Sequence, residues 1–310
     1  MDTGIRKHQS LTLFLCVLVL SLASGCRTNQ PSAPFTAGSV NTPPGVINTE
    51  RIVTIGASIS ESVCALGSEK QIVGADDTSL FPESVARLPK VGYQRALQPE
   101  GILSLKPTVV MVSSEAGPAE TFKQIRRAGV PVFVIPSDYS AEGVKNKIRQ
   151  IGQILDKKAA TEALVSRLDQ EFSAVANLAS QSLSRPKVLF FYSRGQGAQM
   201  IAGAETPADA MIRLAGAENA VKTFTGYKPM TPEATVAANP DVILIPAKTM
   251  ELIGGVEALI QLPGIEQTEA GKHCRVVAID DAELLGFGPR TADALNRLVK
   301  AFHPEPGKQP

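Results

Sequence analysis

Residues that could carry out enzymatic or metal chemistry are scarce in this chain. Its 310 residues include 3 His, 4 Cys and no Trp. A catalytic triad or a histidine-based zinc site needs several such side chains placed together. The motifs G-x-S-x-G, H-E-x-x-H and the P-loop are absent, and Gly195-Gln196-Gly197 is too sparse for a dinucleotide site. A hydrolase or metalloenzyme is therefore disfavoured, and we expect a protein that is not an enzyme.

Two of the histidines and the charge balance exclude further classes of protein. His273 opens a predicted strand and His303 lies near the C-terminus, so neither is a persuasive metal ligand. Lysine and arginine number 31 against 30 acidic residues, a formal net charge of +1. No overall field attracts such a chain to a polyanion, and we expect no nucleic-acid partner.

The N-terminus has the composition of an export signal. Arg6 and Lys7 precede thirteen apolar or small residues, too few to cross a bilayer comfortably. Residues 22–26 (LASGC) resemble a bacterial lipobox that is lipidated at Cys26, although Ala23 stands where the pattern usually has Leu. We predict a signal peptide over residues 1–25 and a lipid anchor at Cys26; plain secretion and a retained membrane anchor are the alternatives.

Residues 26–50 are rich in Pro, Ser, Thr, Asn and Gly, which is typical of a flexible tether. We therefore expect an exported protein at the periplasmic or outer surface of the cell envelope, held at the membrane by its lipid only. In such a compartment Cys64 and Cys274 could form a disulfide, but two buried free thiols are the favoured interpretation.

The rest of the chain predicts an α/β fold. Short β-branched runs alternate with amphipathic segments over residues 51–156 and again over 183–310, which indicates parallel sheets covered by helices. Between them, apolar residues recur at steps of three and four, and a single helix over residues 157–182 would span about 39 Å. Such a helix would be a rigid connection between two halves.

An internal repeat relates the two halves. Pro99-Glu100 and Pro232-Glu233 are each followed by six residues, a proline, one residue and an apolar strand, at an offset of 133. This match predicts two Rossmann-like lobes of related fold, each a mostly parallel sheet with flanking helices, joined by one long rigid helix.

Three stretches carry a resemblance to a known family. Residues 88–97 (LPKVGYQRAL) with 99–101 (PEG), residues 202–210 (AGAETPADA) and residues 286–290 (GFGPR) are similar to patterns of periplasmic haemin-binding proteins. That family belongs to the ABC-importer binding proteins whose lobes are joined by one long helix, the siderophore, cobalamin and haem group. The resemblance covers residues 50–305. It implies that Tyr93 is an axial ligand of haem iron and that Arg290 lies near it.

The chemistry of these residues is consistent with that role. A phenolate is a hard oxygen donor suited to ferric iron, and a nearby cation would stabilise it. Arg95 is one candidate cation, and Arg290 is a second, for the phenolate or a haem propionate. We expect Phe287 and Met200 to cover the porphyrin, with Tyr192 and Tyr227 as further second-lobe contacts.

Each of these residues also has a simpler interpretation. Tyr93 could be a loop tyrosine packed on Pro99, and Arg95 could be a solvated charge. Arg290 could cap the final helix. The resemblance favours the haem role for Tyr93.

The repeated glutamates are candidates for docking. In the resembled group, one glutamate on each lobe meets arginines of the two permease subunits, and Glu100 and Glu233 stand at the matching positions. The alternative is that both are first-turn acids stabilised by their helix dipoles.

Taken together, the sequence predicts a haem-binding component of a haem ABC importer. It would bind ferric haem between its lobes and deliver it to a permease dimer with ATPase subunits. An outer-membrane haem receptor system is a further candidate partner. A ferric siderophore or cobalamin is the alternative cargo.

Overall fold

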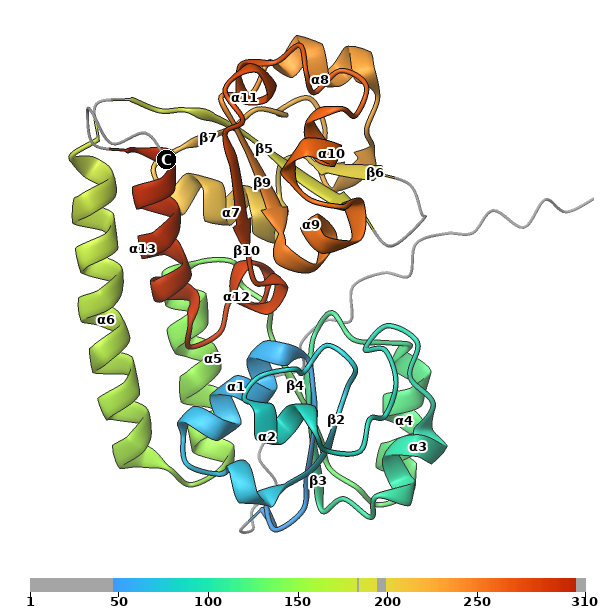
Figure 1. Cartoon of the computed structure of the whole chain (residues 1–310). Helices are drawn as coiled ribbons and strands as arrows, with labels where there is room; N and C mark the ends of the chain where they lie inside the picture. The colour runs from blue at the N-terminus through green and yellow to red at the C-terminus, as the bar shows by residue number, and fades with distance from the viewer. Residues whose placement is uncertain (1–46, 183, 194–198, 305–310) are drawn as a thin grey trace, which may run out of the picture. The chain divides into compact units, whose positions relative to one another are not determined.

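The computed structural model describes residues 47–182, 184–193 and 199–304 (Figure 1). The predicted signal over residues 1–25, the lipidation site Cys26 and most of the predicted tether lie outside this part of the chain. Within it, no helix is both long and apolar enough to cross a membrane.

The N-terminal sheet is fully parallel. Its strands are β1 (Ile52–Ile55), β2 (Ile72–Ala75), β3 (Val109–Ser113) and β4 (Val132–Ile135), in the order β2-β1-β3-β4. Helices in this half are α1 (Ala57–Ala65), α2 (Glu83–Ala86), α3 (Pro99–Ser104) and α4 (Ala119–Arg127), with a 3₁₀ turn at Glu69–Gln71.

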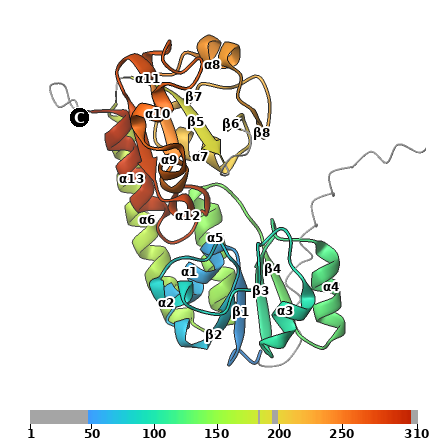
Figure 2. The ribbon, with the colours of Figure 1, turned by 45° about the vertical axis from the view of Figure 1, so that its right-hand side comes forward.

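Both faces of this sheet are covered. Successive strand residues point to opposite faces, and each face packs into its own apolar cluster. Ile52 of β1 packs into the cluster that contains Ile59 of α1 and Ile148. Val53 and Ile55 pack into the cluster that contains residues of α3 and α4, among them Ile102, Phe122 and Ile125. The continuous apolar runs of the sequence are thus explained by burial on both faces, and Figure 2 shows α3 and α4 together on one side of the strands.

The helical region between the halves consists of two helices. α5 (Ala141–Ile154) begins at the N-cap Ser140, whose side chain accepts a hydrogen bond from the amide of Gly143. Asp156, with φ of 53°, interrupts the helical path, and α6 (Lys158–Ser180) follows within the predicted 157–182. α6 packs against α5 and against α13 (Thr291–Phe302), as Figures 1 and 2 show. Its buried side recurs at steps of three and four: Thr161, Leu164, Val165, Leu168, Phe172 and Val175.

The C-terminal sheet is mixed, which the sequence did not predict. Its strands are β5 (Lys187–Ser193), β6 (Gln199–Ala202), β7 (Glu218–Asn219), β8 (Tyr227–Pro229), β9 (Val242–Pro246) and β10 (Val276–Ile279). β10, β9, β5 and β7 pair in parallel, whereas β6 pairs antiparallel with β5 and β8. The helices are α7 (Pro207–Leu214), α8 (Pro232–Ala238), α9 (Ala247–Ile253), α10 (Val256–Ile260), α11 (Glu269–Lys272), α12 (Asp281–Leu285) and α13.

The two halves share one arrangement of strands. The order β4-β3-β1-β2 in the first corresponds to β10-β9-β5-β7 in the second. The sequence repeat occupies equivalent places, since α3 precedes β3 and α8 precedes β9, and each helix has its proline in the first turn. Lys106 and Asn239, also 133 residues apart, are both left-handed just before a proline. The predicted α/β fold with two related lobes is therefore confirmed.

Two smaller expectations need correction. Cys64 and Cys274 are both free, as favoured, but Cys274 is exposed and Cys64 is only partly buried. His273 does not open a strand, because it ends α11 and β10 begins three residues later.

Candidate ligand-binding site

The loop that carries Tyr93 lies at the carboxyl ends of the N-terminal strands. Gly92 has a φ of 99°, which a residue with a side chain rarely adopts, and its carbonyl accepts a hydrogen bond from the amide of Asp77 just beyond β2. The carbonyl of Gln94 accepts one from the amide of Gly117, beyond β3. Ligands of open parallel sheets bind at this edge, outside the carboxyl ends of the strands.

Arg95 is held by a carboxylate from the next loop. Its Nη2 lies 2.9 Å from Oε2 of Glu115, which follows β3. The hydroxyl of Tyr139, which follows β4, donates to Oε1 of the same carboxylate. Arg95 itself is largely exposed, so the predicted cation stands at the surface with its direction set by Glu115.

Tyr227 of β8 brings the second lobe to this cluster. Burial raises its pKa to about 12, and the negative charge of Glu115 adds to the rise while Arg95 opposes it. Burial likewise raises the pKa of Tyr139, assisted by the charge of Glu115 and their hydrogen bond. Tyr139, which donates to Glu115, also contacts the ring of Phe287 from the second lobe, so this carboxylate lies close to where the two lobes meet.

The other second-lobe candidates lie on adjoining strands. Tyr192 of β5 is the pairing partner of Met200 in β6, and Tyr227 of β8 pairs with Ala202 of the same strand. The ring of Phe190 lies 6.4 Å from that of Tyr192 and 6.3 Å from that of Tyr227. Met200 is half-buried. The structure thus groups an aromatic and thioether surface that could contact a flat apolar ligand.

Arg290 makes ion pairs that the sequence did not predict. Its Nε donates to Oε2 of Glu61 at 3.0 Å, and its Nη1 donates to Oε1 of Glu283 at 2.7 Å. Its guanidinium also lies 3.9 Å from the ring centre of Phe81. Arg290 therefore serves as an ion-pair partner of α1 and α12. It occupies the N-cap position of α13 but makes no side-chain cap hydrogen bond.

Phe287 is also placed differently from the expectation. Its side chain is 1% exposed, so its ring belongs to the core and not to a ligand-facing surface. The ring of Tyr139 lies against it, with centroids 5.2 Å apart. Tyr139 thus contacts the ring of Phe287 on one side and donates to Glu115 through its hydroxyl.

Glu100 and Glu233 occupy matching positions on the two lobes. Each follows a first-turn proline, in α3 and α8 respectively, and each side chain is exposed. Neither makes an ion pair or a side-chain hydrogen bond with the residues that the structure describes. Both carboxylates are therefore available to an external cation.

Lys147 of α5 is a residue that the sequence analysis did not single out. It is 3% exposed, and its ammonium donates to the hydroxyl of Ser58 and to the carbonyls of Gly286 and Phe287 at 2.9, 3.2 and 2.8 Å. Burial lowers its pKa to about 8, although the charges of Glu115, Glu61 and Asp138 oppose the shift. One lysine in an ordinary amphipathic pattern carries no signal of this role.

The lowered pKa of Lys147 predicts a pH-dependent stability. Between about pH 8 and the usual 10.5, the unfolded state holds a proton that the native state has released, so native stability rises with pH in that window. We expect the difference in unfolding free energy between wild type and Lys147→Met to increase by up to about 1.4 kcal/mol per pH unit there. Urea unfolding of both proteins at several pH values from 7 to 10 measures it; parallel pH profiles would contradict the assignment.

Comparison with known proteins places this architecture in a family. The periplasmic binding protein family (Peripla_BP_2) matches residues 52–283. The solved periplasmic heme-binding protein RhuT of Roseiflexus sp. RS-1, in its apo form, is 42% identical, with a TM-score of 0.80 over 82% of this chain and 98% of that one. An uncharacterized ABC transporter substrate-binding lipoprotein, YvrC, of Bacillus subtilis is 27% identical over 84% of this chain and 82% of its own.

A third relative is named for a different ligand. A cobalamin-binding protein of Halobacterium salinarum is 26% identical over 88% of this chain and 73% of its own length. The family match covers most of the chain, and the Roseiflexus structure covers both lobes at an identity well above 30%. The chain belongs to the periplasmic binding protein family.

Proposed function

We propose that this substrate-binding protein of an ABC importer carries ferric haem, bound between its lobes through the phenolate of Tyr93. The observation that carries the proposal is the grouping at the carboxyl edge of the first sheet. Tyr93 and Arg95 belong to one loop there, which is held by backbone hydrogen bonds to the loops after β2 and β3. The charges of Arg95 and its partner Glu115 influence the pKa of Tyr227 in the second lobe. The Roseiflexus relative supports haem as the cargo.

The chemistry needed is binding and release only. Tyr93 would supply the oxygen donor to iron, and the charge of Arg95 would favour its phenolate form. Tyr192, Tyr227 and Met200 would contact the porphyrin from the second lobe. A permease dimer with ATPase subunits would receive the haem, with Glu100 and Glu233 as its contacts, so the chain itself needs no catalytic group.

A haemin titration tests the proposal. Wild type should give a shifted Soret band that saturates at a definite stoichiometry. Tyr93→Phe should change the band position and weaken binding by at least about 100-fold, because even outer-shell partners of a metal ligand are worth about 10–100-fold. Glu162→Gln, on the exposed side of α6 and outside the proposed site, should keep the wild-type spectrum. Identical spectra for wild type and Tyr93→Phe would contradict ligation by Tyr93.

Cobalamin is the second candidate, favoured by the Halobacterium relative. The same titration with cyanocobalamin separates the two. Both axial positions of its cobalt are already filled, by cyanide and by its own benzimidazole, so it needs no phenolate ligand from the protein. Binding of cyanocobalamin that is unaffected by Tyr93→Phe, together with an unshifted haemin spectrum, would replace haem with cobalamin.

The N-terminal sequence supports a place for the protein in the cell envelope. Export by residues 1–25 and lipidation at Cys26 would tether the two lobes to a membrane through residues 26–50. The name of the Bacillus relative, a substrate-binding lipoprotein, supports this arrangement.

A further inference from the structure

We infer that Glu61, Lys147 and Arg290 are positioning residues for ligand binding, because they form a joint that fixes one lobe against the other. This interlobe joint consists of Ser58 and Glu61 of α1, Lys147 of α5 and residues 286–290. Its role in ligand binding rests on the proposed function, whereas its mechanical role does not.

Lys147 connects three elements from both lobes. The ammonium donates to Ser58 in the first lobe and to the carbonyls of Gly286 and Phe287 in the second. All three of its N–H groups are thereby used, and water has almost no access to them. Displacement of residues 286–287 from α1 would remove two of the three acceptors of a buried ammonium and leave only Ser58, which is unfavourable.

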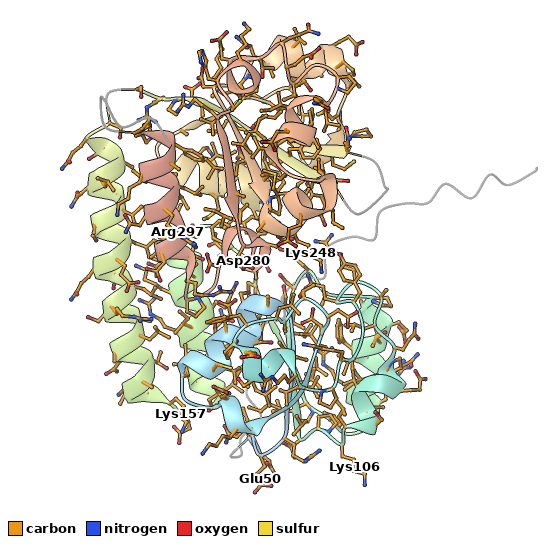
Figure 3. The ribbon with its side chains drawn as sticks, in the orientation of Figure 1. Glu50, Lys106, Lys157, Lys248, Asp280 and Arg297 are labelled. Atoms are coloured by element: carbon orange, nitrogen blue, oxygen red, sulfur yellow. The ribbon has the colours of Figure 1, made fainter. Side chains whose placement is uncertain are left out.

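Arg290 makes a second connection beside the first. The side chain of Glu61 is 5% exposed and that of Arg290 is 19% exposed. Arg290 donates to both oxygens of Glu61 through Nε and Nη2, while its Nη1 donates to Glu283 of α12. The fork-like geometry of a guanidinium makes such a pair directional. Asp280 and Arg297, labelled in Figure 3, extend the network on the second lobe, at Arg290 and Glu283 respectively.

The backbones of the two lobes approach closely at the same place. A Cβ added to Gly288 would lie 3.1 Å from Cβ of Ser58 and 3.5 Å from Oε2 of Glu61. Glycine at this position therefore allows residues 286–290 to lie directly on α1, where the ion pair and the lysine can both reach. Three independent features thus define a single relative position of the lobes.

The interlobe joint is also in contact with the proposed site. Phe287, whose carbonyl accepts from Lys147, packs its ring on Tyr139. Tyr139 donates to Glu115, and Glu115 holds Arg95. A shift of residues 286–290 would therefore be transmitted through two aromatic rings and one carboxylate to the cation beside Tyr93. The GFGPR sequence is accordingly assigned to lobe positioning, with its arginine acting through Glu61.

A distance measurement between the lobes tests the inference. Spin labels are placed on the native Cys274 of the second lobe and on Lys106→Cys of the first, with Cys16→Ser, Cys26→Ser and Cys64→Ser to leave two labelled thiols. Pulsed electron resonance of the ligand-free protein should give a narrow distance distribution. Arg290→Gln and Lys147→Met should broaden or shift it, and both should release haemin about 10-fold faster, as expected for outer-shell partners of a metal site.

Two further variants keep the result interpretable. Arg213→Gln removes an arginine that pairs with Asp209 inside the second lobe, and it should leave the distribution and haemin release unchanged. Arg290→Lys keeps the charge but not the fork, and serves if Arg290→Gln does not fold. An unchanged distance distribution in the Arg290 and Lys147 variants would overturn the inference that these residues fix one lobe against the other. A wild type that fails to bind haemin would instead overturn the proposed function, and the distance measurement would still decide the joint.

Discussion

Arg290→Met should lower the free energy of unfolding by about 3–5 kcal/mol, the range for leaving one partner of a buried ion pair uncompensated. The substitution removes the cation from a Glu61 carboxylate that is only 5% exposed. Burial raises the pKa of Glu61 and Arg290 opposes that rise, so the arginine favours the charged form of this carboxyl. Urea unfolding followed by circular dichroism near neutral pH measures the loss.

A double-mutant cycle identifies the cause of that loss. Glu61→Gln removes the buried charge itself, so the variant that combines it with Arg290→Met should lose less than the sum of the two single changes. Arg213→Met is the matched control, because its pair with Asp209 is largely exposed on the arginine side and should contribute less than about 1 kcal/mol. Additive losses at Glu61 and Arg290 would show that the two side chains are not energetically coupled.

Reversing the charge at both Glu100 and Glu233 should reduce haem uptake by at least about 10-fold while haemin affinity stays at the wild-type value. Placing like charges opposite each other in an interface costs several kcal/mol, and about 1.4 kcal/mol already corresponds to a factor of ten. Neither carboxylate is paired within the described part of the chain, so Glu100→Arg and Glu233→Arg should remove no internal contact. Uptake by cells with the cognate permease and haemin titration of the purified protein give the two readouts.

The control for the Glu100 and Glu233 variants is a charge reversal on another surface of the protein. Glu162→Arg changes an exposed glutamate of α6 and should leave both uptake and affinity unchanged. Reduced haemin affinity in the Glu100 and Glu233 variants would contradict a docking role and would place these glutamates in ligand binding. Normal uptake by the double variant would mean that both glutamates only stabilise the first turns of their helices.

Much of the fold could be predicted because its determinants are local. The Pro-Glu segments begin α3 and α8 at the predicted places, since a first-turn proline and an acid are favourable there in any context. The apolar runs became β3 and β9, each buried between neighbouring strands. The period of three and four residues before Ser180 became α6.

The second sheet was harder to predict because two of its strands lack a local signal. β6 has four residues and β8 has three, and β8 ends in Pro229 at the edge of the sheet, where a missing amide is tolerated. The antiparallel pairing begins at β5, whose first residues pair with β7 and whose last residues pair with β6. Segments this short are defined by their neighbours and not by their own pattern.

The candidate site shows the same division. Tyr93 and Arg95 could be proposed from one short stretch of sequence, and the carboxyl-edge rule could have pointed to Glu115 and Tyr139 as residues that directly follow β3 and β4. Arg290 could not be assigned in this way. Its partner Glu61 is 229 residues away along the chain, and only folding of both lobes brings the two together.

The sequence by itself therefore determined most of the longer elements, the two related α/β lobes and the repeat of Glu100 and Glu233, because propensity, capping and hydrophobic period act over a few residues. The tertiary structure alone decided that Phe287 is a core residue, that Lys147 is buried between lobes, and that Arg290 pairs with Glu61. Burial and ion pairing depend on which distant surfaces meet, and that is a property of the packed chain and not of any short segment.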